Sequence, residues 1–278
     1  MDEQYKALYI EGGTAEEAIA RLSAIMKVLR KECPWDREQT HESLRACLLE
    51  EAYEVCEAID KNNIGNLEEE LGDVLLQVVF HSEIAAEMSK FDFVSVINKE
   101  CDKLLRRHPH VFLKENVKSV DKAIERWENM KWKEKEDASY STRLGSIPKA
   151  LPALIRSCKL QKKAAEAGFD WDDVSGAFQK IKEETEELAV ACISRDDGKI
   201  KEELGDLLFS VVNLSRFLDV NPEQALNATS DKFIQRFAFI EREAVSRGDS
   251  LENMSLEEMD ELWEKAKQSE VRRGTAKT

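Results

Sequence analysis

Eight acidic residues form two sets with the same internal spacing. They are Glu51, Glu54, Glu70 and Asp73 in the first set, and Glu184, Glu187, Glu203 and Asp206 in the second. Each set consists of two pairs whose members stand three apart, so that the members of a pair share one face of a helix. If the two helices of a set fold back as an antiparallel hairpin, its four carboxylates meet at one level. Every position of the second set follows its counterpart by 133 residues.

Carboxylates that converge in this way indicate a metal site. Acidic runs on helices are more often solvated faces, but Glu51 and Glu184 border the apolar stripes of their helices, where desolvation adds to the cost of like charges. The repetition of the layout also argues against a solvated face. Oxygen ligands alone select a hard cation, Mg²⁺ with Mn²⁺ as a substitute. Because Mg²⁺ shares its ligand shell with substrate phosphates, the sets point to a nucleotide or a polyphosphate.

Basic residues follow each acidic set at matching positions. Lys232 and Arg236 stand four apart in helical sequence, which makes one cationic face suited to phosphate oxygens. Lys103 and Arg107 have the same spacing in the first half of the chain. Surface lysines and arginines are common, so this signal gains its weight from its position after the acidic residues.

Tryptophans accompany both halves of the chain. After each basic pair comes a tryptophan with a lysine four residues later: Trp127 with Lys131, and Trp263 with Lys267. Such a tryptophan either stacks on a nucleobase or fills the core, and the sequence leaves both alternatives open. The same two alternatives apply to Trp35 and Trp171.

The composition favours a helical protein of the cytoplasm. Of 278 residues, 42% are hydrophobic and 35% are charged, with only 11 Gly and 5 Pro, which favours long helices over a turn-rich β fold. A net charge of −15 argues against direct nucleic-acid binding. The 6 cysteines are scattered without a CxxC pair, which indicates reduced thiols in the cytoplasm. The sequence has no run of about eighteen apolar residues, so we expect no membrane span.

Helical patterns divide the chain into two copies of one unit. In the first copy, Thr14 and Glu17 form a capping box for a helix over 14–30, a second helix is predicted over 40–60, and Asn66 is expected to cap a third. After a linker the pattern restarts. The predicted organisation is an N-terminal unit over 14–135, a linker over 136–150 and a C-terminal unit over 151–270. The fold class that this pattern predicts is an all-α tandem repeat.

The motifs resemble those of the MazG family of nucleoside triphosphate pyrophosphohydrolases, within the all-α NTP pyrophosphatase superfamily. The residues that carry the resemblance are the two acidic sets together with Cys33-Pro34-Trp35-Asp36, Arg106-Arg107-His108-Pro109-His110-Val111-Phe112 and Gly168-Phe169-Asp170-Trp171. The resemblance covers roughly residues 14–270. It implies Mg²⁺-dependent cleavage of an NTP between its α- and β-phosphates, which gives NMP and pyrophosphate and serves house-cleaning or control of the nucleotide pool. It also implies a homodimer, with four-helix-bundle-like cores completed by the partner.

Residue roles follow from the same resemblance. Metal ligation falls to Glu184, Glu187, Glu203 and Asp206, and in the first copy to Glu51, Glu54, Glu70 and Asp73. Nucleotide contacts fall to Lys180, Lys232, Arg236, Trp263 and Lys267. We expect water to attack the α-phosphorus, activated by a metal or by a glutamate outside the metal shell, and Glu183 is the candidate base beside Glu184 and Glu187. Lys232 and Arg236 are expected to stabilise charge on the pyrophosphate leaving group.

The second copy is the one expected to be catalytic. Lys180 stands four before Glu184, so a lysine shares the face of that carboxylate and can reach a phosphate. In the first copy the corresponding residue is Cys47, which cannot supply the charge. The resemblance also favours the C-terminal unit.

Two other classes of function stay open on the sequence. One is a non-catalytic regulatory protein whose acidic hairpins only bind metal or nucleotide. The other is a hydrolase of narrow specificity, dUTPase-like or acting on phosphoribosyl-ATP, and the tandem format counts against it.

Overall fold

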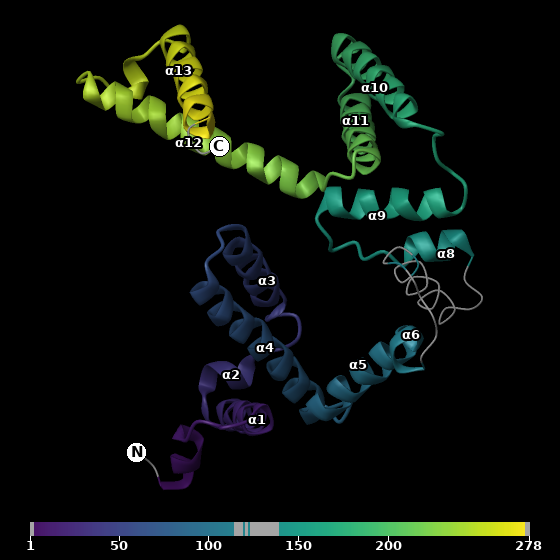
Figure 1. Ribbon diagram of the computed structural model, residues 1–278, viewed down its shortest axis with the longest axis vertical. Coiled ribbons are helices and arrows are strands. Elements are labelled where there is room, and N and C mark those ends of the chain that lie inside the picture. Colours follow the sequence, from purple (N-terminus) through teal and green to yellow (C-terminus); the bar gives the residue numbers. More distant parts are fainter. Residues whose placement is uncertain (1–2, 114–118, 120–121, 123–138, 276–278) are drawn as a thin grey trace. The chain divides into compact units, whose positions relative to one another are not determined.

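The structure is a computed structural model that describes residues 3–113, 119, 122 and 139–275 (Figure 1). The chain divides into two compact units, Met1–Glu136 and Asp137–Thr278. All regular elements within the described ranges are α-helices or short 3-10 helices, so the predicted all-α fold is confirmed. None of these helices has the length and hydropathy needed to cross a bilayer. Trp127 and Lys131 lie outside the described residues.

The first unit is built around a long helical hairpin. Its elements are η1 (Glu3–Tyr9), α1 (Ala15–Glu32), α2 (Pro34–Glu38), α3 (Arg45–Asp60), α4 (Ile64–Glu87), α5 (Phe93–Arg107) and α6 (Pro109–Phe112). Helices α3 and α4 pack against each other, and α1 and α5 pack on α4. The hairpin that the acidic spacing predicts is therefore present.

Local hydrogen bonds set the ends of these helices. Thr14 caps α1 by accepting the Glu17 N–H at 3.3 Å, and the Glu17 carboxylate accepts the Gly13 N–H at 2.7 Å. The predicted cap at Asn66 is wrong, because α4 begins at Ile64 and its cap is Asn63. The Asn63 backbone is extended, and its side chain accepts the Asn66 N–H at 3.2 Å. Asn66 is thus the donor in the capping interaction.

The core of the first unit lies between α1 and the second half of α4. Its buried residues are Met26, Leu44, Val79, Phe80 and Ile84. Leu44 comes from the segment before α3, so the core also fixes where the acidic helix starts. Burying these side chains is the main term that stabilises the unit.

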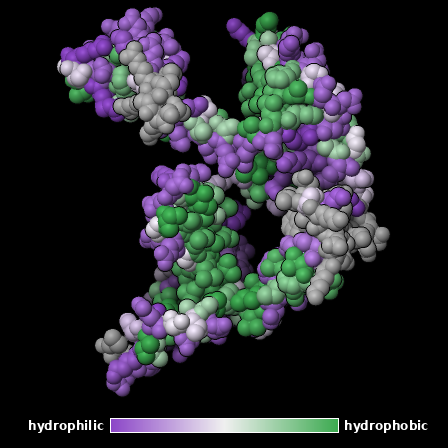
Figure 2. All heavy atoms as spheres, viewed as in Figure 1, coloured by the Kyte–Doolittle hydropathy of each residue, from purple (hydrophilic) through white to green (hydrophobic). Residues whose placement is uncertain are grey.

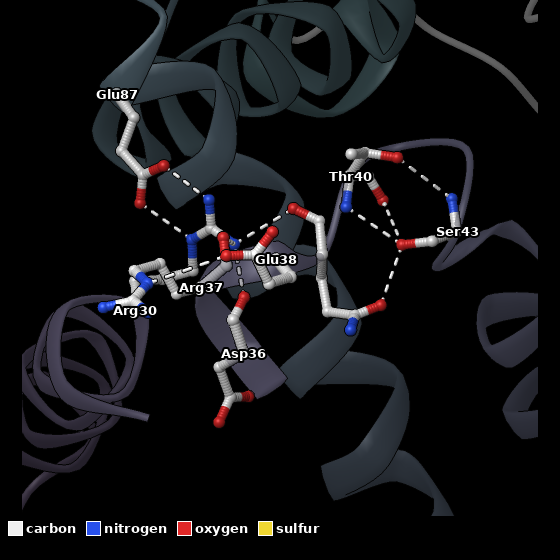
Figure 3. A network of polar contacts seen from close by, with 8 residues as sticks. Arg30, Asp36, Arg37, Glu38, Thr40, Ser43 and Glu87 are labelled. Atoms are coloured by element: carbon white, nitrogen blue, oxygen red, sulfur yellow. Dashed lines mark hydrogen bonds and ion pairs between the residues drawn. The ribbon is translucent and has the colours of Figure 1, made fainter. Parts of the chain in front are cut away.

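A buried arginine joins the core to the segment that follows α2 (Figure 3). Arg30 of α1 is only 8% exposed, and its guanidinium forms an ion pair with the carboxylate of Glu87 on α4, with an Nε to Oε1 distance of 2.7 Å. Its Nη1 also donates to the backbone carbonyl oxygens of Asp36, Arg37 and Gln39. One side chain thereby ties α1, α2, α4 and the approach to α3 together.

The second unit contains two helical hairpins. Its elements are α8 (Tyr140–Gly145), α9 (Ala153–Glu166), α10 (Val174–Ser194), α11 (Asp197–Phe217), α12 (Pro222–Ser246), η2 (Leu251–Asn253) and α13 (Leu256–Thr275). Helices α10 and α11 form the more extensive hairpin, α9 packs on α11, and α12 packs on α13 and α9. The short helix α8 lies inside the segment predicted as a linker and is capped by Ser139.

We expect Arg30→Ala to lower the free energy of unfolding of the full chain by about 1–3 kcal/mol, because three backbone carbonyls and Glu87 lose their donor. Urea unfolding followed by circular dichroism measures the change. The matched control is Lys31→Ala, which removes a neighbouring side chain that is 80% exposed and should change the free energy by about 0.5 kcal/mol or less. Equal effects of the two substitutions would contradict the role given to Arg30.

Candidate active site

The second acidic set is positioned by the α10–α11 hairpin. Asp173 caps α10 by accepting hydrogen bonds from the Ser175 hydroxyl and, at 2.7 Å, from the Ser175 N–H, and these two hydrogen bonds lower the pKa of Asp173. Arg195 ends α10 in the left-handed region with a φ of 55°. Asp196 then caps α11 by accepting the N–H groups of Gly198 and Lys199, each at 3.1 Å. The tight turn fixes the register in which acidic residues of the two helices face each other.

Three carboxylates of the set converge across the hairpin. Glu184 of α10 and Glu203 and Asp206 of α11 offer oxygens that all lie within 4.8 Å of one another. A second group on α10 consists of Glu183, Glu184 and Glu187. Glu184 belongs to both groups and is only 3% exposed. The predicted fourth member, Glu187, therefore joins the cluster through Glu184.

Lys180 neutralises part of this charge. Its Nζ lies 2.7 Å from the Oε1 of Glu183 and 2.5 Å from the Oε1 of Glu184. Hydrogen bonds to Glu183 and Glu184 raise the pKa of Lys180, so the ammonium stays charged at any physiological pH. The sequence spacing predicts this shared face, and the contacts confirm it.

The cluster fits a hard divalent cation. Its donors are carboxylate oxygens, and their mutual spacing suits an ion with metal–oxygen distances of about 2.0–2.6 Å. Desolvation raises the pKa of Glu203, and the charges of Glu187 and Glu184 raise it further. A cation bound between these groups would relieve that repulsion.

The first acidic set forms a similar but less neutralised cluster on α3 and α4. Glu51, Glu54 and Glu70 come together, and the fourth predicted member, Asp73, lies outside this group. Asp73 still acts on the cluster, because the pKa of Glu51 is raised by desolvation and then by the charge of Asp73. The Glu70 carboxylate accepts a hydrogen bond from the side-chain amide of Asn66 at 3.0 Å. The second cluster has the ammonium of Lys180. The first cluster has Cys47 at the corresponding position and the neutral side-chain amide of Asn66.

The other predicted nucleotide-binding residues gather on α12 and α13. The Arg236 guanidinium lies 5.3 Å from the centroid of the Trp263 ring, and the Phe233 ring lies 5.2 Å from it. Lys267 pairs with Glu264 at 2.6 Å, and Lys232 is exposed on α12. Since α12 packs chiefly on α13 and α9, the structure groups these residues with one another rather than with the carboxylates of α10 and α11.

The sequence interpretation missed an ion pair that anchors the segment before α10. The guanidinium of Arg216 on α11 binds both oxygens of Asp170, with an Nη1 to Oδ2 distance of 2.9 Å. The motif Phe169-Asp170-Trp171 is visible in the sequence, but its partner lies 46 residues away. No spacing rule connects residues so far apart.

Comparison with known proteins gives matches over both halves of the chain. The family described as MazG nucleotide pyrophosphohydrolase domain matches residues 39–112 and 163–238, so each match contains one acidic set, and the predicted tandem repeat is confirmed. A Thermotoga maritima protein named nucleoside triphosphate pyrophosphohydrolase/pyrophosphatase MazG is 48% identical over 248 residues, which cover 88% of this chain and 94% of the relative. An Escherichia coli K12 protein named nucleoside triphosphate pyrophosphohydrolase is 40% identical over 258 residues, 91% of this chain and 98% of the relative.

We expect Mg²⁺ to raise the melting temperature of the full chain, because it would bind the folded clusters and not the unfolded chain. A hundredfold excess over the dissociation constant corresponds to about 2.7 kcal/mol. Scanning calorimetry with and without Mg²⁺ measures the gain. The gain in melting temperature should be smaller in Glu203→Gln than in the control Glu186→Gln. The control removes an exposed charge that belongs to none of the carboxylate groups. Equal gains in both variants would exclude the α10–α11 cluster as a Mg²⁺ site.

Proposed function

The chain belongs to the MazG nucleotide pyrophosphohydrolase family, and on that premise we propose that it is a Mg²⁺-dependent nucleoside triphosphate pyrophosphohydrolase. It would convert NTP and water into NMP and pyrophosphate, as a control on the nucleotide pool. The observation that carries the proposal is the buried Glu184 carboxylate, which meets Glu203 and Asp206 across the hairpin and has Lys180 beside it. Both named relatives carry this activity in their names.

The second acidic set supplies the proposed metal ligands. Glu184, Glu187, Glu203 and Asp206 would hold the cation. When bound, Mg²⁺ supplies positive charge to the phosphates and lowers the pKa of a ligated water. Lys180 is close enough to Glu184 for its ammonium to contact a phosphate oxygen bound at the same place.

Glu183 is the proposed acceptor for the proton of the attacking water. Its carboxylate is exposed and lies in one group with Glu184 and Glu187, which places it beside the proposed cation site. The Glu183 carboxylate is paired with the Lys180 ammonium at 2.7 Å, and a positioned carboxylate of this kind can act as a general base. A bound triphosphate would compete for Lys180. The Glu183 carboxylate would then be able to accept the proton of the attacking water.

We also propose that two copies of the chain assemble through the acidic hairpins. Both hairpins expose apolar stripes at matching positions: Leu71, Leu75 and Val78 on α4, and Leu204, Leu208 and Val211 on α11. Each of these side chains is between 36% and 52% exposed, and Figure 2 shows apolar residues gathered along these helices. Exposed stripes of this kind mark an interaction surface. A second copy would cover them and bring its Lys232 and Arg236 to the phosphates.

The choice between the two clusters gives the first test of the proposal. We expect Glu184→Gln to lower kcat/KM by on the order of a hundredfold or more, because it removes a metal ligand. Glu51→Gln should do much less, because the first cluster lacks the lysine. Pyrophosphate release from a mixed NTP pool with Mg²⁺ measures both, with Glu186→Gln as the exposed control. The reverse ranking of Glu184 and Glu51 would move the activity to the first unit.

Subunit complementation gives the second test. We expect Lys232→Ala to lower activity by removing a cation that faces the phosphates. If Lys232 of one copy serves Glu184 of the other, coexpressed Lys232→Ala and Glu184→Gln chains form heterodimers with one intact site, and activity returns. If each site lies within one chain, both sites of the heterodimer are damaged and no activity returns. A light-scattering mass equal to a single 31.8 kDa chain would also overturn the dimer.

A further inference from the structure

Trp171 lies against the first turn of α10, at a glycine that makes room for it. A Cβ added to Gly176 would come within 2.8 Å of the Trp171 ring atoms Cγ and Cδ2, and within 2.9 Å of Cε3. These distances are shorter than side chains tolerate, so any other residue at position 176 would displace the indole. Trp171 is nevertheless 48% exposed, which leaves a large part of its ring open to solvent.

Polar contacts hold Trp171 in this exposed position. The Asp170 carboxylate accepts the backbone N–H of Trp171 at 2.9 Å and binds the Arg216 guanidinium through both oxygens. Arg216 belongs to α11, so the segment before α10 is anchored to both helices of the hairpin. By contrast, Trp263 is half-buried and packs on Phe233 and Arg236. An anchored but exposed indole contributes little to a core and offers an aromatic surface to a ligand.

Trp171, Lys180 and the carboxylates follow one another along a single face of α10. Gly176, Lys180 and Glu184 stand four apart in turn, and Glu183 and Glu187 share that face. At 1.5 Å per residue, Lys180 lies about 6 Å beyond Gly176 along the axis, and Glu184 about 12 Å. The order along the helix is therefore aromatic ring, cation and carboxylate cluster.

We propose that Trp171 is the stacking platform for the nucleobase of the bound triphosphate, an inference that rests on the proposed function of the α10–α11 cluster. A nucleotide has the matching order of groups: an aromatic base, a ribose and then the phosphates. With the phosphates at Lys180 and the carboxylates, the base extends towards the start of α10, where the indole lies. Stacking accepts any base, because every base has a π face. The platform thus gives affinity for nucleoside triphosphates as a class and little selection among them.

The test compares ligands with and without a base, in the presence of Mg²⁺. Titration calorimetry measures the binding of α,β-methylene ATP and of α,β-methylene CTP, and tripolyphosphate is the ligand without a base. We expect Trp171→Ala to weaken binding of both nucleotides by about tenfold or more and to leave tripolyphosphate binding unchanged. Trp171→Phe should retain most of the affinity. Trp35→Ala, which removes a 60% exposed tryptophan of the first unit, should leave all three affinities unchanged.

A second variant keeps the indole but moves it. Gly176→Ala adds the Cβ that meets the ring and raises helix propensity, and circular dichroism checks that the variant keeps its helical content, so that a loss of nucleotide affinity reports the displaced ring. Equal loss of tripolyphosphate and nucleotide binding in Trp171→Ala would overturn the platform and leave Trp171 a structural role. Unchanged nucleotide affinity would overturn it as well. If the wild-type chain binds the nucleotides but does not hydrolyse ATP, the proposed function is contradicted. The calorimetry would still test whether Trp171 binds the base.

Discussion

The ion pair between Lys180 and Glu184 is the interaction on which the second unit depends. A carboxylate with 3% of its surface exposed needs a partner of opposite charge, because an uncompensated buried charge costs on the order of several kcal/mol. Lys180 supplies the compensation from the same helix, one turn earlier, at 2.5 Å. Glu184 can therefore face α11 and meet Glu203 and Asp206 there. The first unit has the same layout of carboxylates without this cation, which is the physical basis for treating the two clusters as unequal.

The hairpin keeps this arrangement in register. Small buried side chains, Ala177 and Ala191, line α10, and Val212 is buried on α11. Larger apolar side chains of the same helices, such as Leu204, Leu208 and Val211, are exposed. The caps at Asp173 and Asp196 satisfy the exposed N–H groups at the start of each helix. The unit thus has a narrow internal core and a broad exposed apolar stripe, which is the distribution that an assembly through the hairpins requires.

Features set by local spacing could be predicted from the sequence. Both acidic hairpins, the shared face of Lys180 and Glu184, and the capping box at Thr14 all involve residues three or four apart or a simple fold-back of two helices. The cap at Asn63 was missed by three residues, because Asn63 and Asn66 are both good capping residues and only the backbone distinguishes them. Contacts between distant residues left no periodic signal. Arg30 with Glu87, Asp170 with Arg216, and the Trp171 ring at Gly176 depend on how helices and loops pack, which propensity does not specify.

The most direct measurement is the anomalous diffraction of Mn²⁺ in crystals of the full chain grown with α,β-methylene ATP. Manganese substitutes for magnesium at oxygen sites and is located without reference to any assumed chemistry. The account predicts a peak bounded by Glu184, Glu203 and Asp206, with the phosphates of the nucleotide beside Lys180. A peak confined to the cluster of Glu51, Glu54 and Glu70, or phosphates bound away from both hairpins, would contradict it.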